Sequence, residues 1–356
     1  MMMMEEEMMN IIKVWSSTLA SLTYCYFIAA KIPQGPPRLL SLLPIFYIFS
    51  ILPFTFSLIH LRGISAFFLT WLANFKLLLF SFNQGPLTPP RDLLHFITTA
   101  SLPIKSKDDD PVPDPSSGTH NEPVSPISMG LRGLILGLVI YCYKYKAHMH
   151  EKLVLGLYCI HMYLALEVVL AMARAAAQAM VGVALEPQFD EPYLSSSLQD
   201  FWGRRWNLMV TRILRPTVYD PIRRVCTGIV GPRWAQVVGM WATFVVSGLM
   251  HEVMFYYLTC ERPTWEVTWF FVLHGFCTGA EVWVKKSLTG RCRLPRVVSG
   301  FLTLGFVSVT GFWLFFPQIV RSGTDVKVIR EYSALVDFLK ATKIRVLNLR
   351  SFVFFG

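Results

Sequence analysis

Charged side chains are scarce in this sequence. Of its 356 residues only 16% are charged, whereas 53% are hydrophobic, the aromatic residues included. A soluble globular domain carries about 25% charged residues, because its surface must be solvated. The composition therefore excludes an ordinary soluble protein and indicates a chain that crosses a membrane several times. The charges are also unbalanced, with 33 Lys and Arg against 23 Asp and Glu.

Several signatures of known chemistry are absent as well. The seven cysteines form no CxxC pair, which argues against a disulfide framework or a zinc site. Phe255 stands where the HExxH motif of a zinc protease needs its second histidine. The chain also has no GxSxG nucleophile motif, no HxxxxD motif and no Walker or dinucleotide fingerprint. We therefore expect no metal and no cofactor, and no partner among the nucleic acids.

Long apolar runs predict an all-α polytopic membrane protein of about eight transmembrane helices. A spanning helix needs about 20 mostly apolar residues, and the chain lacks the alternation of a membrane barrel. The expected spans are 12–30, 39–59, 64–82, 131–143, 153–173, 236–259, 265–284 and 297–316. They predict one membrane-embedded domain over residues 1–356. Residues 105–130 are rich in Pro, Ser and Asp, which predicts a disordered loop.

The segment 186–235 is polar, basic and yet rich in aromatic residues. Within it, Ser197 and Asp200 form a capping-box-like start for a helix that is expected to end at Arg215 and Pro216. Helical spacing places on one apolar stripe Trp202, Trp206, Met209 and Ile213. A neighbouring, partly basic face carries Phe201, Arg205, Leu208, Arg212 and Arg215. The pattern predicts an amphipathic helix at the membrane interface.

Two interpretations of this helix stay open. It can simply bind anionic lipid headgroups, or it can dock a polyanionic substrate, since the planar arginine fork matches phosphate. The arginines concerned are Arg204, Arg205, Arg212 and Arg215. Asn207 adds an amide that membrane anchoring does not require. The excess of Lys and Arg predicts that this segment and the loop 285–296 lie on one side of the membrane, the cytosolic side.

A second polar group lies in the sequence SGLMHE, deep inside an expected span. His251 and Glu252 are costly in hydrocarbon, and such residues by default suggest a functional site. Ser247 and Gly248 share the helical face of His251 and are expected to leave a slot beside its ring. The alternative is a packing histidine bonded to a neighbouring helix. We expect the other intramembrane histidines, His161 and His274, to be structural.

At these residues the chain resembles the membrane-bound O-acyltransferases, and among them the plant wax synthase group, which includes acyl-CoA:sterol acyltransferases. The resemblance rests on residues 69–80, 186–221 and 244–252. It implies a helical bundle around an intramembrane reaction chamber, with His251 at the family's invariant histidine and Asn207 at the asparagine of its Trp-Asn motif. The block reads FWGRRWN, without the Asp-Trp-Trp-Asn ending of diacylglycerol and animal sterol acyltransferases, which points to the wax synthase branch.

The resemblance implies transfer of a fatty acyl group from acyl-CoA to the hydroxyl of a lipophilic alcohol, in the endoplasmic reticulum membrane. His251 is expected to act as general base, Asn207 to position the substrate or polarise the thioester carbonyl, and Glu252 to orient the site or hold helices together. Residues expected to bind substrate are Arg204, Arg205, Arg212, Arg215, Trp202, Trp206, Ser247 and Gly248. Besides these substrates, the expected partners are membrane lipids; the oligomeric state stays open.

Three functions remain in competition at this point. A long-chain fatty alcohol as acceptor, giving a wax ester, is favoured because residues 186–221 resemble those of wax synthases. A sterol acceptor is the alternative, because the same plant group contains both specificities. A lipid transporter without enzyme activity is the third, although the sequence shows none of the internal repeats that transporters often have.

Overall fold

The computed structural model describes residues 2–89, 92–102, 126–182, 188–288 and 295–355, and within these ranges every regular element is a helix. This confirms the predicted all-α class. The α-helices are α1 (Met2–Phe27), α2 (Pro36–Ile51), α3 (Ile59–Ser65), α4 (Asn74–Ser81), α5 (Leu93–Ser101), α6 (Pro126–Cys142), α7 (Glu151–Val181), α8 (Leu198–Asp200), α9 (Leu208–Leu214), α10 (Asp220–Thr259), α11 (Glu266–Leu288), α12 (Arg296–Thr310), α13 (Pro317–Arg321) and α14 (Thr324–Phe355). Tight 3-10 or wide π-helical turns adjoin several of them, among them Ala66–Ala73, Phe201–Arg205, Arg215–Tyr219 and Gly311–Phe315.

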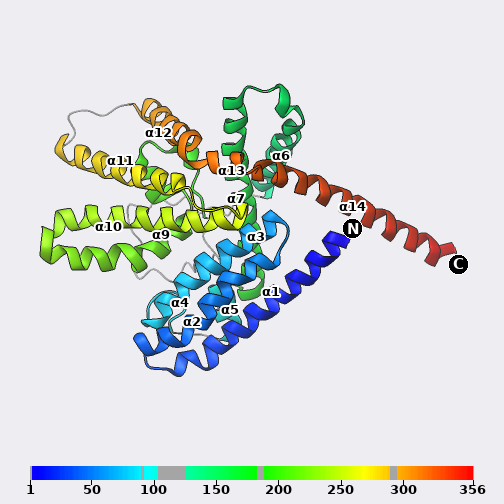
Figure 1. Ribbon diagram of the computed structural model, residues 1–356, viewed down its shortest axis with the longest axis horizontal. Helices are drawn as coiled ribbons and strands as arrows, with labels where there is room; N and C mark the ends of the chain where they lie inside the picture. The colour runs from blue at the N-terminus through cyan, green and yellow to red at the C-terminus, as the bar shows by residue number, and fades with distance from the viewer. Residues whose placement is uncertain (1, 90–91, 103–125, 183–187, 289–294, 356) are drawn as a thin grey trace.

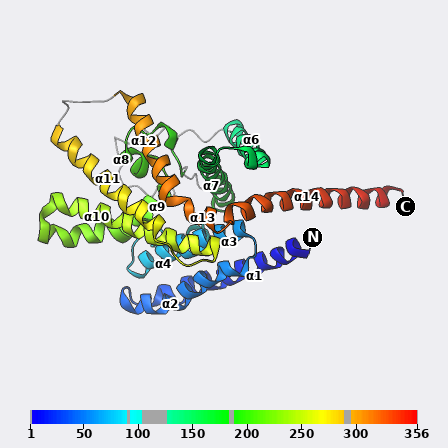
Figure 2. The same cartoon turned by 45° about the horizontal axis from the view of Figure 1, so that its top comes forward.

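Two groups of helices meet at a central helical segment, and α6 and α7 form a separate pair (Figures 1 and 2). Helices α1, α2 and α5 lie together on one side, and α10, α11 and α12 lie on the other. The segment between them, residues 59–81, runs through α3, the π-helical turn Ala66–Ala73 and α4, and it contacts both α2 and α10. It is the most deeply buried of the helices that could cross a membrane, because 67% of the residues in its most apolar stretch are buried inside the protein. The long helix α14 extends away from both groups (Figure 1).

Six helices among the described residues are long and apolar enough to cross a membrane. They match six of the eight expected spans and are Pro36–Thr55, Ile59–Ser81, Glu151–Met180, Leu208–Thr259, Glu266–Lys285 and Arg296–Phe315. The other two expected spans, 12–30 and 131–143, are largely helical in α1 and α6 but do not qualify. Acidic, serine and threonine side chains make α1 too polar, and α6 has only 17 residues. The chain is a polytopic membrane protein, and six helices of its described part meet this criterion.

The predicted loop 105–130 falls mostly outside the described residues. Its last residues, 126–130, are described and are helical at the start of α6, so the loop prediction is wrong for this short stretch. Pro126 begins α6, at a position where proline's missing N–H costs nothing because the first turn leaves that group unbonded anyway.

Helix α10 contains a sharp reversal rather than one straight rod. Gly231 has φ 78° and ψ 162°, outside the helical region, and Pro232 follows it. The two arms on either side of this point pack against each other (Figure 1). Tyr219 lies so close to Gly239 that a Cβ added there would meet the Tyr219 carbonyl oxygen at 3.1 Å. The expected span 236–259 is therefore the second arm of a helical hairpin, and it carries His251.

Buried charged side chains form hydrogen bonds with the unpaired backbone groups at helix ends in the interior. Lys76 is fully buried, and its Nζ donates to the carbonyl oxygens of Thr99 and Leu102, each at 2.6 Å, where α5 ends. The last carbonyls of a helix have no partner within the helix, and a cation there also interacts favourably with the helix dipole. One buried lysine thus ties α4 to the end of α5.

Two carboxylates from opposite ends of the chain satisfy the start of α3. Glu7 accepts hydrogen bonds from the two backbone N–H groups just before the helix, at 2.7 and 3.1 Å. Glu331 of α14 accepts from the N–H groups of Ile59 and His60, at 2.6 and 3.1 Å, and pairs with the His60 ring at 2.6 Å. Burial opposes ionisation of Glu331, yet these hydrogen bonds outweigh it and hold its pKa below the ordinary 4.5. Helix α1 and the first part of α14 are thereby attached to the central segment.

Replacement of Glu331 by alanine is expected to destabilise the protein by about 1–3 kcal/mol, because two buried N–H groups lose their acceptor. Since the folded-state pKa is depressed, this stabilisation is complete above about pH 4.5 and is lost as the pH falls through the lower folded value. Thermal unfolding of Glu331→Ala in detergent should therefore differ from wild type at pH 7, and the difference should shrink as the pH is lowered below 4.5. Asp337→Ala, on the exposed part of the same helix, is the control, and a deficit that stays constant as the pH is lowered would contradict the assignment.

Candidate active site

His251 lies in an aromatic cage formed by three other helical segments. Its ring centroid is 4.2 Å from that of Phe271 in α11, 5.0 Å from Trp71 in the central segment and 6.0 Å from Phe315 after α12. The histidine itself is half-buried in the second arm of α10. The cage, defined as Trp71, Phe271 and Phe315, gives the imidazole an apolar surrounding.

The hydrogen bond of His251 defines which ring nitrogen is the base. Nδ1 lies 2.7 Å from the carbonyl oxygen of Ser247, one turn earlier in the same helix. A carbonyl oxygen only accepts, so Nδ1 must carry the proton, and in the neutral ring the lone pair is on Nε2. No described residue forms a hydrogen bond with Nε2. The ring is therefore held in the tautomer that a general base requires.

Glu252 does not contact the ring of its neighbour His251. It is 3% exposed, and its Oε1 accepts from the backbone N–H and the hydroxyl of Thr268, each at 3.2 Å. Thr268 lies in the first turn of α11, where the N–H groups have no partner within the helix. Of the two predicted roles for Glu252, the geometry supports the one that holds helices together, since the contact joins α10 to α11.

Asn207 interrupts the helix that was predicted to run from 197 to 215. The observed chain forms α8 and a π-helical turn up to Arg205, breaks at Asn207 with φ 39°, and resumes as α9. Asparagine enters this left-handed region more readily than most residues. Pro216 does not end the helix either, because the π-helical turn Arg215–Tyr219 leads directly into α10. The predicted single helix is therefore wrong, although its Ser197 cap is confirmed by a 3.1 Å bond from the Asp200 N–H.

The tryptophans of the predicted apolar stripe stay in contact across the break. Trp206 stacks on Phe201 at 5.3 Å and contacts Trp202 at 6.4 Å, and Trp202 in turn packs against Phe271, at 5.6 Å. Phe201, predicted for the partly basic face, is 4% exposed. We call Phe201, Trp202 and Trp206 the aromatic block. It packs into the protein interior and is not an amphipathic helix lying on a bilayer surface. Through Trp202 and Phe271 it reaches the cage around His251.

His274, expected to be merely structural, connects the aromatic block to two other helices. It is fully buried, and its Nδ1 accepts from the indole N–H of Trp202 at 3.0 Å. Its Nε2 therefore carries the proton and donates to the Thr310 hydroxyl of α12 at 2.8 Å, because that hydroxyl already donates to a backbone carbonyl. The sequence offered no sign of this role beyond a histidine in a span, since its partners are distant along the chain.

The small residues before His251 do not leave the expected slot. A Cβ at Gly248 would meet the Thr268 Cα at 3.0 Å and the Phe271 Cβ at 3.3 Å, so α11 already fills that space. Ser247 is 8% exposed and contributes its carbonyl oxygen to His251. The glycine permits close packing of α10 on α11, and the predicted substrate slot at this face is wrong.

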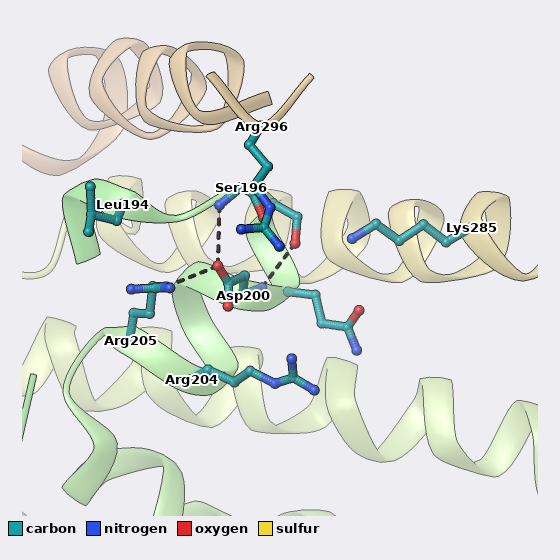
Figure 3. A pocket seen from close by; sticks show the side chains of 9 residues that line it. Leu194, Ser196, Asp200, Arg204, Arg205, Lys285 and Arg296 are labelled. Carbon is teal, nitrogen blue, oxygen red and sulfur yellow. Dashed lines mark hydrogen bonds and ion pairs between the residues drawn. The ribbon is translucent and has the colours of Figure 1, made fainter. Parts of the chain in front are cut away.

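The four predicted substrate arginines do not form one site. Arg205 pairs with the Asp200 carboxylate at 3.0 Å and donates to the Asp190 carbonyl oxygen at 3.0 Å, so it stabilises the turn. Arg204 is exposed and lines a pocket of about 400 Å³ together with Lys285 and Arg296 (Figure 3). Arg212 and Arg215 of the following segment are not among its lining residues. The pocket places Arg204 beside Lys285 and Arg296. This agrees with the prediction that the segment 186–235 and the loop 285–296 lie on the same side of the membrane.

The structure brings His251, Glu252, Trp202 and the cage residues together across several helices. Trp206 joins this group through its contact with Trp202 at 6.4 Å, whereas no contact joins Asn207 to His251 among the described residues. The side-chain oxygen of Asn207 is buried and has no hydrogen-bond partner in the described part of the chain. In that part, no group of three His, Cys, Asp or Glu side chains is arranged to hold a metal ion.

A membrane protein with a neutral, oriented histidine inside an aromatic cage fits a class of enzymes that act on lipids. Residues 185–273, which include the aromatic block and His251, match the family described as membrane bound O-acyl transferase. The chain is 48% identical to a long-chain-alcohol O-fatty-acyltransferase of Simmondsia chinensis, over 95% of this chain and 97% of that protein. It is 46% identical to acyl-CoA–sterol O-acyltransferase 1 of Arabidopsis thaliana, over 93% and 96% of the two chains. The chain belongs to the membrane bound O-acyl transferase family.

A positioning role for His274 predicts that its hydrogen bonds matter more than its bulk. His274→Phe leaves the Trp202 N–H and the Thr310 hydroxyl without their partner, and turnover should fall by about 10²-fold if the block shifts by roughly 1 Å. His274→Gln offers an acceptor and a donor and should restore most of it. Steady-state kinetics of His274→Phe, Trp202→Phe and the double variant form a double-mutant cycle. If the two residues act together, the double variant should lose much less turnover than the two single losses combined. Independent, additive effects at unchanged unfolding temperature would refute the connection.

Proposed function

We propose that this protein transfers a long-chain acyl group from acyl-CoA to the hydroxyl of a long-chain fatty alcohol, forming a wax ester and free CoA. The similarity to proteins named long-chain-alcohol O-fatty-acyltransferase, over nearly the whole chain, supports this reaction and favours it over lipid transport. The observation that carries the mechanism is the free Nε2 of His251 in its aromatic cage. A membrane location suits both the acyl chain and the alcohol, and we place the reaction in the endoplasmic reticulum.

In this mechanism His251 activates the alcohol. Its Nε2 accepts the proton of the hydroxyl while the alcohol oxygen attacks the thioester carbonyl carbon. The tetrahedral intermediate then expels the CoA sulfur, which takes the proton from the imidazolium, so that ester and CoA thiol are formed and the histidine returns to its neutral state. The Ser247 carbonyl keeps the proton of Nδ1 in place throughout. The aromatic cage limits access of water, which protects the thioester from hydrolysis.

We assign supporting roles to the other two predicted residues. The unpartnered side-chain oxygen of Asn207 favours positioning of substrate, because a buried acceptor normally finds a donor. A hydroxyl or an amide N–H of a bound substrate is such a donor. Glu252 keeps α10 against α11 and so holds His251 at its distance from Phe271. Its effect on turnover therefore passes through the position of the histidine.

Removal of the base tests the mechanism directly. His251→Asn keeps an amide near the Ser247 carbonyl but has no basic nitrogen, so ester formation should fall by about 10²–10⁴-fold. Membranes that contain the variant are incubated with labelled acyl-CoA and hexadecanol, and the labelled neutral ester is measured. His148→Ala, an exposed histidine outside the site, serves as the matched control. Wild-type activity in His251→Asn at equal abundance would sink the assignment.

A sterol acceptor is the second candidate, because one similar protein carries the name acyl-CoA–sterol O-acyltransferase. Both acceptors present one hydroxyl on an apolar body, and they differ in width. With hexadecanol and a sterol supplied together, we expect the wax ester to predominate. A clear excess of sterol ester would overturn the choice of acceptor while leaving the acyl-transfer chemistry intact.

A further inference from the structure

One of the three cage residues around His251 carries a polar group. Trp71 lies in the π-helical turn Ala66–Ala73 and is 2% exposed. Its ring centroid is 5.0 Å from that of His251, and the two ring planes are nearly perpendicular, at 86°. The side chains of Phe271 and Phe315 have only apolar atoms. Within the cage, the indole N–H of Trp71 is therefore the one hydrogen-bond donor beside the catalytic histidine.

This N–H is buried and has no hydrogen-bond partner among the described residues. A buried tryptophan usually finds an acceptor for its N–H, because a buried donor without one is costly. The ring faces near Trp71, those of His251 and Phe67, are weak acceptors at best. Since the N–H is also closed to water, the missing acceptor has to be a group that enters the cage.

The turn that carries Trp71 is attached to the helices around it. The hydroxyl of the neighbouring Thr70 donates to the Phe49 carbonyl oxygen of α2 at 2.9 Å. Tyr257, in the same arm of α10 as the catalytic histidine, donates to the next carbonyl of α2, that of Ser50, at 2.5 Å. A donor fixed in this way needs no rearrangement at the moment of reaction, which is the property that stabilises a transition state. Wide π-helical turns also occur frequently at functional sites.

We propose that the Trp71 N–H donates a hydrogen bond to the thioester carbonyl oxygen as negative charge develops on it, an inference that rests on the proposed acyl transfer. When the alcohol oxygen bonds to the carbonyl carbon, one electron pair of the C=O double bond moves onto the carbonyl oxygen. The pair returns as the C–S bond breaks, and the electrons of that bond leave with the sulfur, which takes the proton from His251. Trp71 keeps its own proton throughout and stabilises only the charged oxygen.

The place of Trp71 favours the carbonyl oxygen as its acceptor. The alcohol oxygen must lie within about 2.6–3.2 Å of His251 Nε2 to give up its proton, and after attack the carbonyl oxygen is two bonds away from it. A donor has to be within about 2.7–3.1 Å of the charged oxygen, so it must belong to a side chain beside the imidazole. The unpartnered atom of Asn207 is an oxygen, which only accepts, and no contact joins this residue to His251 among those described.

Replacement of Trp71 by benzothienylalanine tests the donor, because this residue keeps the fused rings of tryptophan and has sulfur in place of the N–H. With palmitoyl-CoA and hexadecanol, kcat of the purified variant in detergent should fall by about 10²–10³-fold, the effect of losing one such donor. The Kd for S-hexadecyl-CoA, a thioether without the carbonyl oxygen, should stay at the wild-type value. The same replacement at Trp234, which is 61% exposed on α10 and outside the cage, is the matched control and should change neither quantity.

Two results would overturn the proposal. One is a wild-type kcat in the benzothienylalanine variant. The other is a Kd for the thioether that rises as much as kcat falls, because the indole would then act only in packing. Trp71→Phe, which also lacks the N–H, should lose at least as much kcat, and unfolding temperatures show that both variants are folded. The proposed function fails separately: it falls if the wild-type protein forms no ester with any alcohol, whereas an active wild type with an equally active variant removes only the role of Trp71.

Discussion

The ends of helices inside an apolar body are the constraint on which the rest of this structure depends. A backbone N–H or carbonyl group that is left without a partner in such surroundings costs several kcal/mol. The chain meets this requirement with its few charged side chains. Glu7 and Glu331 satisfy the start of α3, Lys76 the end of α5 and Glu252 the start of α11. Scarce charge is thus placed where helices end, and each such contact joins two different elements of the chain.

The site follows from these attachments. Glu252 brings α11 against α10, and the absence of a side chain on Gly248 permits the close approach. Phe271 of α11 then lies 4.2 Å from the His251 ring, and the same phenylalanine receives Trp202 from the aromatic block. His274 holds the indole of Trp202 from the other side. The position of one imidazole therefore depends on contacts with several helical segments as well as on the Ser247 carbonyl oxygen of its own helix.

The surroundings of His251 are aromatic rather than charged. The cage around His251 contributes shape and a low dielectric, in which a hydrogen bond to the ring is stronger than in water. Charged groups remain at the edge, where Arg204, Lys285 and Arg296 surround a polar pocket. One turn, Phe201–Arg205, borders both environments, because it carries Trp202 of the aromatic contacts and Arg204 of the pocket.

Much of this protein was readable from its residues. Hydropathy identifies the helical class and six spans, because a spanning helix must bury a continuous apolar run whatever its neighbours are. A histidine and a glutamate within such a run mark the site for the same reason. The partner of Glu252 and the roles of Gly248, His274 and the arginines were beyond the sequence, because each depends on a contact with another part of the chain. Helical spacing also assumed an unbroken helix, and the left-handed residue Asn207 redirects every side chain after it. Local periodicity determines which residues share a face only as far as the helix continues; which faces meet is decided by packing between helices.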